Sequence, residues 1–343
     1  MGIYLTHIAL WNLFGYRNVS WNVQNDVNIL GGSNGSGKST MFNICHQLLG
    51  WGFITEPRYA NLVEKVELSF DNGWRMIWDK QPFTKNTERE NGYNYRNVDN
   101  NKVEKDGTFL VQRVIAYDTE NHVIDPAEIV RSIPTALVSS FEQNILEAQT
   151  KVSDTPVEDR TYLDVLLSSC ISKRNERISQ IFYNYLSQAA EVNNVDAMHQ
   201  LTITGKDAQY LKSFNDALMV FFGKDYDIKT GMEARISMTS KKSGKLIKYQ
   251  DLSLGEKEVL LMIVVTSNSY DEPVIFWLDE PDLGLHVDWQ SSLVKTLRML
   301  NPNIQLFIST HAPSMVEGNM DKVIEMSEIS TFRDEQHTET KSK

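Results

Sequence analysis

The stretch Gly32-Ser33-Asn34-Gly35-Ser36-Gly37-Lys38-Ser39 decides the fold of this chain of 343 residues. It fits the phosphate-binding loop pattern, in which a glycine and four further residues precede Gly-Lys-Ser. An apolar run at residues 27–31 comes before the loop, and apolar residues at helical spacing follow it to about residue 49, with Gly50 as the predicted end. This strand–loop–helix setting favours a phosphate site over a plain glycine-rich surface loop.

The side chains and backbone of the loop suggest how it would hold phosphates. Glycines let the chain turn tightly, so that successive amide N–H groups point inward at the β- and γ-phosphates, beside the positive end of the following helix. Lys38 supplies a mobile positive charge, and the Ser39 hydroxyl can ligate Mg²⁺. The other predicted nucleotide-binding residues are Gly32, Asn34, Gly35, Ser36, Gly37 and Thr40.

Two carboxylates follow a second apolar run. Residues 274–278 predict a strand buried on both faces. Asp279 and Glu280 then emerge at its carboxyl end, where ligands of α/β sheets bind. Asp279 is predicted to hold the Mg²⁺ shell and Glu280 to orient and polarise the attacking water. Strands that simply end in two acids are common, but the phosphate loop in the same chain favours the functional interpretation.

Two further motifs are weaker when taken alone. Leu-Ser-Leu-Gly-Glu at residues 252–256 opens a helix, with Ser253 as N-cap and Glu256 completing a capping box, so a well-made helix start explains it. Yet the Ser253 hydroxyl and the Gly255 amide at a helix N-terminus also form an anion site. Another apolar strand ends in His311, which at the same sheet edge can reach a γ-phosphate.

The four motifs, in this order, resemble those of the ABC ATPase family. They correspond to the Walker A loop (32–39), the ABC signature (252–256), the Walker B strand (274–280) and the switch histidine, His311. The resemblance covers about the first fifty residues and the region from about 245 to 326.

The resemblance implies a fold, a reaction and an assembly. The expected fold is α/β: a P-loop NTPase head of ABC type with a mixed or parallel central sheet, an antiparallel β subdomain and a helical insert. The expected reaction is hydrolysis of ATP with Mg²⁺, with Glu280, His311 and Lys38 as catalytic residues. In the expected head-to-tail homodimer, Ser253 and Gly255 of one copy contact the γ-phosphate bound by the other.

Three features indicate which branch of the ABC ATPase family the chain resembles. Glu256 stands where transporter ATPases usually have Gln, and Asn-Leu-Phe-Gly-Tyr at residues 12–16 resembles the opening strand of chromosome-maintenance and DNA-repair ATPases. Transporter ATPases and chromosome-maintenance ATPases usually carry Asp where His286 stands in this sequence. The pair Leu285-His286, with Ser-Thr-His-Ala-Pro at 309–313, is similar to the OLD-like ATPases of bacteria, which include the ATPase subunits of anti-phage systems such as Septu, PARIS and retron-linked modules.

The leading hypothesis is therefore an ATP-driven switch that controls a separate effector, a nuclease in the simplest case, in bacterial anti-phage defence. A dimer or a larger assembly fits this hypothesis. One alternative is a repair-type ATPase that binds DNA directly, and the net charge of −11 counts against it. A transporter subunit is the third hypothesis, and Glu256 and His286 count against it. The basic strip at residues 241–245 is interpreted as a solvated hairpin tip.

The chain is expected to divide into four parts. They are the N-terminal part of the head with Walker A and the antiparallel β subdomain (1–144), a helical insert or signature lobe (145–230), the C-terminal part with signature, Walker B and His311 (231–326), and a flexible tail (327–343). The insert either docks a partner or completes the signature lobe. Gln143 is the candidate loop glutamine for nucleotide and Mg²⁺, and a surface glutamine is the alternative.

Several simpler expectations complete the prediction. No apolar run reaches the roughly 18 residues of a membrane span, and the N-terminus lacks the pattern of a signal peptide, so we expect a cytoplasmic chain with no membrane partner. Cys45 and Cys170 are expected to be buried, reduced thiols. Phe14 and Tyr16 either stack on adenine or sit in the N-terminal sheet. A polar, Asn-rich loop is expected at residues 85–106.

Overall fold

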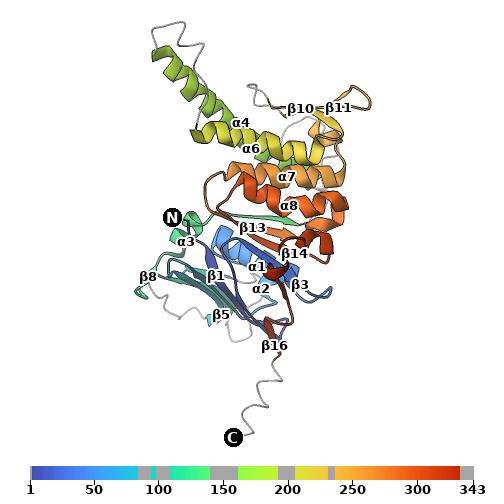
Figure 1. Cartoon of the computed structure of the whole chain (residues 1–343). Helices are drawn as coiled ribbons and strands as arrows, with labels where there is room; N and C mark the ends of the chain where they lie inside the picture. The colour runs from blue at the N-terminus through green and yellow to red at the C-terminus, as the bar shows by residue number, and fades with distance from the viewer. Residues whose placement is uncertain are drawn as a thin grey trace, which may run out of the picture. The chain divides into compact units, whose positions relative to one another are not determined.

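The computed structural model describes residues 2–83, 94–97, 109–139, 161–191, 205–230 and 236–332 (Figure 1). The chain separates into two compact units. Unit 1 comprises residues 1–137, 273–280 and 303–343, and unit 2 comprises residues 138–272 and 281–302. The Walker A loop and the Walker B strand lie in unit 1, and the helix that begins at the signature lies in unit 2.

The five-stranded sheet of unit 1 has the strand order β15-β3-β14-β13-β9. Its strands are β3 (Val27–Gly31), β9 (Thr135–Ser139), β13 (Val274–Asp279), β14 (Ile304–Ser309) and β15 (Val323–Glu325). The pairs β13–β14, β14–β3 and β15–β3 are parallel, and every residue of β3, β13 and β14 is buried. Because Asp279 pairs with Ser309 and Ser309 with Leu30, the carboxyl ends of β13, β14 and β3 meet at one edge.

A second, antiparallel sheet completes unit 1. Its order is β16-β2-β1-β4-β5-β7-β6, with β8 paired to β7. The strands are β1 (Leu5–Leu13), β2 (Arg17–Asn22), β4 (Lys65–Phe70), β5 (Arg75–Phe83), β6 (Asn94–Asn97), β7 (Phe109–Tyr117), β8 (Val123–Ile124) and β16 (Ser330–Phe332). The short turn Asp71-Asn72-Gly73 joins β4 to β5 as a hairpin.

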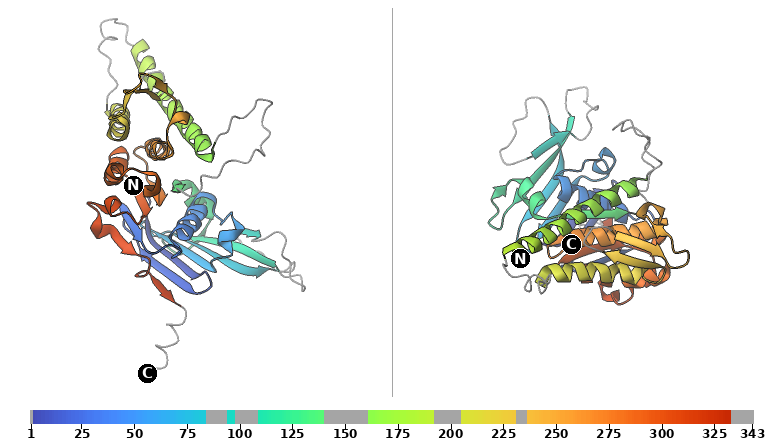
Figure 2. Two further views of the ribbon diagram at one scale, coloured as in Figure 1. Left: turned by 90° about the vertical axis from the view of Figure 1, so that its right-hand side faces the viewer. Right: turned by 90° about the horizontal axis from the view of Figure 1, so that it is seen from above.

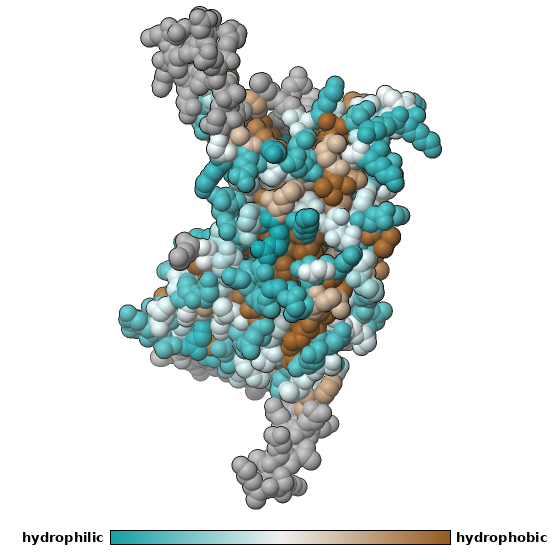
Figure 3. Space-filling model, in the orientation of Figure 1, coloured by the Kyte–Doolittle hydropathy of each residue, from teal (hydrophilic) through white to brown (hydrophobic). Residues whose placement is uncertain are grey.

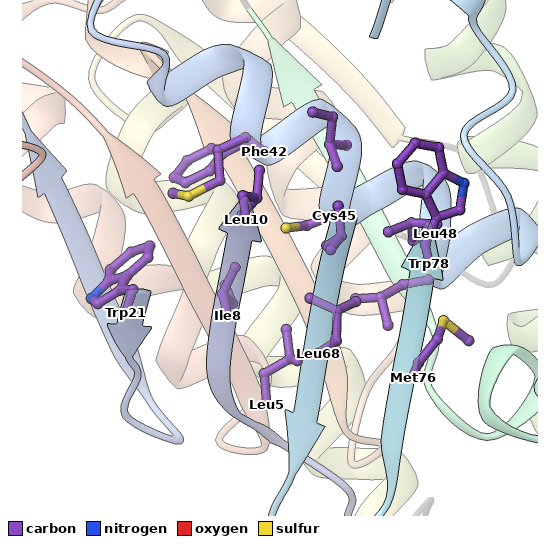
Figure 4. Close-up of a cluster of buried hydrophobic side chains, with 14 of the residues drawn as sticks. Leu5, Ile8, Leu10, Trp21, Phe42, Cys45, Leu48, Leu68, Met76 and Trp78 are labelled. Carbon is purple, nitrogen blue, oxygen red and sulfur yellow. The ribbon is translucent and has the colours of Figure 1, made fainter. Parts of the chain in front are cut away.

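Helix α1 (Lys38–Trp51) contributes to the core shared by the two sheets, together with the short helices α2 (Pro57–Ala60) and α3 (Pro126–Ser132). Figure 4 shows side chains of β1, β4 and β5 pointing toward Phe42, Cys45 and Leu48 of α1. These side chains are almost completely buried, which accounts for the apolar spacing in the sequence. The packing fixes the direction of α1 and therefore the position of the loop before it.

The structure corrects three expectations in unit 1. Helix α1 passes through Gly50 and ends at Trp51, where the Gly52 N–H donates to the Leu48 carbonyl. Within the stretch expected to be a loop, β6 pairs with β7. The expected tail contains β16, because Ser330 pairs with Val19 and continues the sheet beyond β2. Residues 333–343 lie outside the described part.

Unit 2 combines helices with a small antiparallel sheet. The helices are α4 (Tyr162–Glu191), α6 (Gly205–Phe222), α7 (Leu254–Asn268) and α8 (Val287–Leu300), and the sheet order is β10-β11-β12 (Tyr226–Thr230, Ile236–Ser240, Leu246–Ile247). The short turns η1 (Tyr249–Asp251) and η2 (Pro281–Gly284) precede α7 and α8. Helices α4, α6 and α8 all contact α7, and the view from above in Figure 2 shows α4, α6 and α7 side by side.

Helix α7 is tied to α4 by a buried ion pair. Lys257 of α7 forms an ion pair of 2.9 Å with Asp164 of α4, and both side chains are largely buried. The predicted hairpin is formed by β11 and β12, with the basic strip 241–245 at its turn. Strand β10 was not predicted from the sequence.

The thiols and the surface match the simpler expectations only in part. Cys45 is buried and Cys170 is half-buried, and neither forms a disulfide. Burial raises the pKa of both thiols, so they remain protonated at neutral pH. In the described part of the chain, no helix is long and apolar enough to span a membrane. Figure 3 shows hydrophobic residues interspersed with hydrophilic ones on the visible face.

Candidate nucleotide-binding site

The glycine-rich loop curls over the N-terminus of α1, which begins at Lys38. Gly37 has a left-handed backbone (φ 103°), and a Cβ there would lie 2.9 Å from the Phe14 ring, so glycine is required twice over. The Ser36 hydroxyl is buried and has no hydrogen-bond partner among the described residues. A phosphate oxygen would supply that partner, and the site therefore fits a nucleotide.

The ammonium of Lys38 is held in the loop rather than in solvent. The residue is almost fully buried, and Nζ donates to the carbonyls of Gly32 at 2.6 Å and Ser33 at 3.4 Å. It also lies 3.0 Å from Nε2 of His311. Bound phosphates could replace these carbonyl acceptors, because an ammonium has three donors that reorient easily.

Oxygen ligands for a divalent cation meet beside Lys38. The hydroxyls of Ser39 and Ser309 both donate to Oδ1 of Asp279, at 2.9 Å and 2.6 Å. Asp279 is buried, and hard cations prefer such carboxylate and hydroxyl oxygens. No group of three or more His, Cys, Asp or Glu side chains suited to a metal occurs in the described residues. A Mg²⁺ ion held by Ser39 and Asp279 would complete its shell with phosphate and water oxygens, as Mg²⁺ commonly does in phosphate sites.

Glu280 lies beyond the end of β13 with a left-handed backbone (φ 49°). Its N–H donates to both the carbonyl and the hydroxyl of Ser309, at 3.0 Å each. This pairing fixes the turn and brings Oε1 to 3.9 Å from Nε2 of His311. The edge formed by β3, β13 and β14 thus brings together Lys38, Ser39, Asp279, Glu280 and His311. Asn34 is exposed and Thr40 half-buried, while Gln143 lies outside the described residues.

The signature residues lie in unit 2 at the start of α7. Ser253 is the N-cap: its N–H donates to Oε2 of Glu256 at 2.7 Å and the Glu256 N–H donates to its hydroxyl at 3.4 Å, which confirms the predicted capping box. The Ser253 hydroxyl also donates to Oε2 of Glu256, at 2.7 Å. A Cβ on Gly255 would lie 1.9 Å from the carbonyl oxygen of Gly284 in η2. A glycine at this position is therefore explained by the close approach of two backbone segments within one chain.

We expect Gly255→Ala to lower the stability of the folded protein, in addition to any effect on a contact between Gly255 and phosphate. The added methyl cannot fit 1.9 Å from a carbonyl, so α7 and η2 must separate, at a cost of about 1–3 kcal/mol. Differential scanning fluorimetry should show a Tm lower by roughly 2–10 °C. Gly50→Ala is the matched control, because its Cβ would make an ordinary 3.5 Å contact with Thr135. Equal melting temperatures for the two variants would contradict the interpretation.

Sequence inspection missed a contact behind the loop. The Arg17 guanidinium donates to the Ser36 carbonyl and lies over the rings of Tyr16 and Phe332, at 5.7 Å and 5.3 Å from their centroids. Tyr16 stacks on Phe332 with an interplanar angle of 4°, and Phe14 lies against Gly37. Both predicted aromatic residues therefore contact other parts of unit 1. Phe332 could not be found from the sequence, because it lies in a strand that was expected to be a tail.

A second contact that the sequence does not reveal joins β9, β13 and α1. Oγ1 of Thr135 in β9 accepts from the Trp277 indole N–H of β13 at 3.0 Å and lies 3.2 Å from Nδ1 of His46 in α1. Burial lowers the pKa of His46 to about 4, so its ring is neutral at physiological pH. His286 is instead the N-cap of α8, where Nδ1 accepts from the Asp288 N–H at 3.3 Å.

Comparison with known proteins agrees with this geometry. Residues 27–317 match the family described as "AAA domain, putative AbiEii toxin, Type IV TA system". The chain belongs to this family of P-loop ATPases. The match covers both the loop and the strand ends that carry Asp279 and His311.

Two curated relatives are named as retron ATPases. The chain is 28% identical over 166 residues to the Retron Vc95 probable ATPase of Vibrio cholerae serotype O1 biovar El Tor, which covers 44% of this chain and 30% of that protein. It is 27% identical over 120 residues to the Retron Ec83 probable ATPase of Escherichia coli. That match covers 32% of this chain and 22% of that protein. The matched stretch thus spans less than a third of either relative.

A solved structure confirms the predicted fold. The SMC head bound to the C-winged helix domain of ScpA superposes with a TM-score of 0.51 at 11% identity, covering 96% of this chain and 97% of that chain. The prediction of an α/β head of ABC type, with a parallel sheet beside an antiparallel one, is therefore correct.

Proposed function

We propose that this chain binds and hydrolyses ATP with Mg²⁺ and that two copies close around the nucleotide to switch a separate effector on or off. The observation that carries the proposal is the meeting of Lys38, the Ser39–Asp279 pair and the Glu280–His311 pair at one sheet edge. Each of these groups matches one requirement of phosphoryl transfer, which depends on positioning and charge stabilisation.

In this proposal each side chain has one task. Bound Mg²⁺ would neutralise charge on the β- and γ-phosphates, and Ser39 and Asp279 would hold it. Lys38 would exchange the loop carbonyls for phosphate oxygens. Glu280, fixed by its backbone bonds to Ser309, would orient water and accept its proton. His311, 3.0 Å from Lys38 and 3.9 Å from Glu280, would donate to the γ-phosphate.

The surface around the signature supports closure by a second copy. Leu254, Leu283 and Val287 are 49%, 60% and 57% exposed, and they flank the close contact of Gly255 with Gly284. Exposed apolar residues around a polar anion site are typical of an interaction surface. In a head-to-tail dimer this surface would cover the nucleotide of the partner, and larger assemblies could build on the dimer.

The relatives suggest the biological setting. Because two of them are named as retron ATPases, we place this chain among the ATPases of anti-phage defence and propose a nuclease as the effector that it controls. A repair-type role with direct DNA binding is the second candidate, since the fold is that of the SMC head. The net charge of −11 favours the first, because binding to the DNA backbone needs basic surface.

The test is co-expression of the chain with the product of its neighbouring gene in the native host. We expect ATP to change the amount of co-purified neighbour and phage protection to need both genes. The Lys38→Ala variant should lose both effects, which separates nucleotide control from constitutive binding. Nucleic-acid cleavage or phage protection by the chain alone would contradict the switch hypothesis. ATP-stimulated DNA binding that weakens steeply with salt would instead support the repair-type role.

A further inference from the structure

The hydroxyl of Ser253 has a proton that is already in use. A γ-phosphate oxygen can only accept hydrogen bonds, so the signature serine must donate its single proton to contact one. In this structure the hydroxyl donates to Oε2 of Glu256 at 2.7 Å, and the Ser253 N–H donates to the same oxygen. The serine must therefore exchange a carboxylate acceptor for a phosphate acceptor when nucleotide arrives.

The other oxygen of Glu256 is held from a different element. The Tyr226 hydroxyl of β10 donates to Oε1 at 2.7 Å. Burial, together with the hydrogen bond to Glu256, raises the pKa of Tyr226 to about 12, so the phenol stays protonated and keeps donating at physiological pH. The carboxylate is thus fixed at both oxygens, by β10 on one side and by the start of α7 on the other.

The two anchors have different consequences for nucleotide. When Ser253 turns toward a phosphate, Glu256 loses one donor but keeps the Ser253 N–H and the Tyr226 hydroxyl. Those two bonds prevent the carboxylate from following the hydroxyl toward the phosphate, where two negative charges would repel. Without Tyr226, one oxygen of the carboxylate loses its donor, and the side chain can follow the Ser253 hydroxyl when it turns toward the phosphate.

We propose that Tyr226 is a positioning residue of the signature, which holds Glu256 away from the nucleotide so that Ser253 can engage the γ-phosphate bound by a second copy. The inference rests on the proposed ATP-closed dimer. Tyr226 itself would not touch the nucleotide, and it would affect only the step in which two copies close.

The experiment compares Tyr226→Phe with its parent in the Glu280→Gln background, where closed dimers should accumulate. The readout is the ATP concentration for half-maximal dimer formation, measured by analytical ultracentrifugation. We expect a rise of about threefold to tenfold, which lies within the net contribution of one typical hydrogen bond, because Tyr226 acts on the phosphate contact only through Glu256. Affinity for ATP below the dimerisation concentration, measured with a fluorescent analogue, should stay unchanged.

Two further variants separate positioning from packing. Tyr249→Phe is the matched control, because the Tyr249 hydroxyl of η1 makes no hydrogen bond among the described residues. In a Glu256→Ala background, Tyr226→Phe should have no further effect, because the group that it positions is absent. A shift of the same size in that background would overturn the proposal, as would an unchanged half-maximal concentration. If the Glu280→Gln parent forms no dimer with ATP at all, the proposed function itself fails.

Discussion

Lys38→Ala is expected to lower the affinity for ATP by at least about 100-fold, since two or more charge-assisted hydrogen bonds to phosphate disappear with the ammonium. Lys38 is nearly fully buried and bonded to the loop carbonyls of Gly32 and Ser33, so the charge is prepositioned where phosphates would lie. Isothermal titration calorimetry with ATP and Mg²⁺ measures this affinity directly, and turnover should fall with it.

The control for Lys38→Ala is Lys65→Ala on β4. Lys65 belongs to the same unit, lies over the Trp11 ring at 4.2 Å from its centroid and forms an ion pair with Glu67. We expect this variant to bind ATP like the wild type. Thermal melting of both variants distinguishes lost binding from lost folding, because Lys38 also bonds two carbonyls of its own loop. ATP affinity within about threefold of the wild type in Lys38→Ala would contradict the assigned role of the loop.

The nucleotide edge could be predicted because its determinants are local in sequence. The loop from Gly32 to Ser39 lies between a buried strand and an amphipathic helix, and the run 274–278 ends in two acids. Parallel strands must place their carboxyl ends at one edge, so Asp279 and His311 were expected near the loop. The hydrogen bonds through Ser309 were not expected, although the residue lies two positions before His311.

Contacts between distant segments could not be predicted. Phe332 reaches Arg17 only because β16 pairs with β2, across more than 300 residues of sequence, and short polar strands carry little periodicity. Tyr226 reaches Glu256 because β10 packs near the start of α7. The five residues of β10 alternate between half-buried and exposed side chains, but so short an alternation does not indicate which element the strand contacts. Position 255 also needs glycine because the Gly284 carbonyl lies close to it. The signature motif alone would explain this glycine only by contact with phosphate.

Glu280→Gln is expected to keep ATP binding and to slow hydrolysis by a factor of about 10²–10⁴, the usual contribution of a general base. An amide has nearly the same shape and can stay near His311, but it cannot take the proton of the attacking water. The backbone turn should survive, because it depends on the Glu280 N–H and on Ser309. Phosphate release and ATP affinity, measured on the same preparation, separate the two effects.

The same variant also tests the dimer, because ATP that is not hydrolysed should hold two copies together. Light scattering coupled to size-exclusion chromatography should show a dimer with ATP and a monomer without it, and adding Lys38→Ala should abolish the dimer. Glu317→Gln, an exposed glutamate in the same unit, is the matched control and should turn over ATP normally. Full turnover in Glu280→Gln would exclude this carboxylate as the base. Slow turnover without a dimer would support the assigned catalytic role of Glu280 but contradict the proposed dimer closed around ATP.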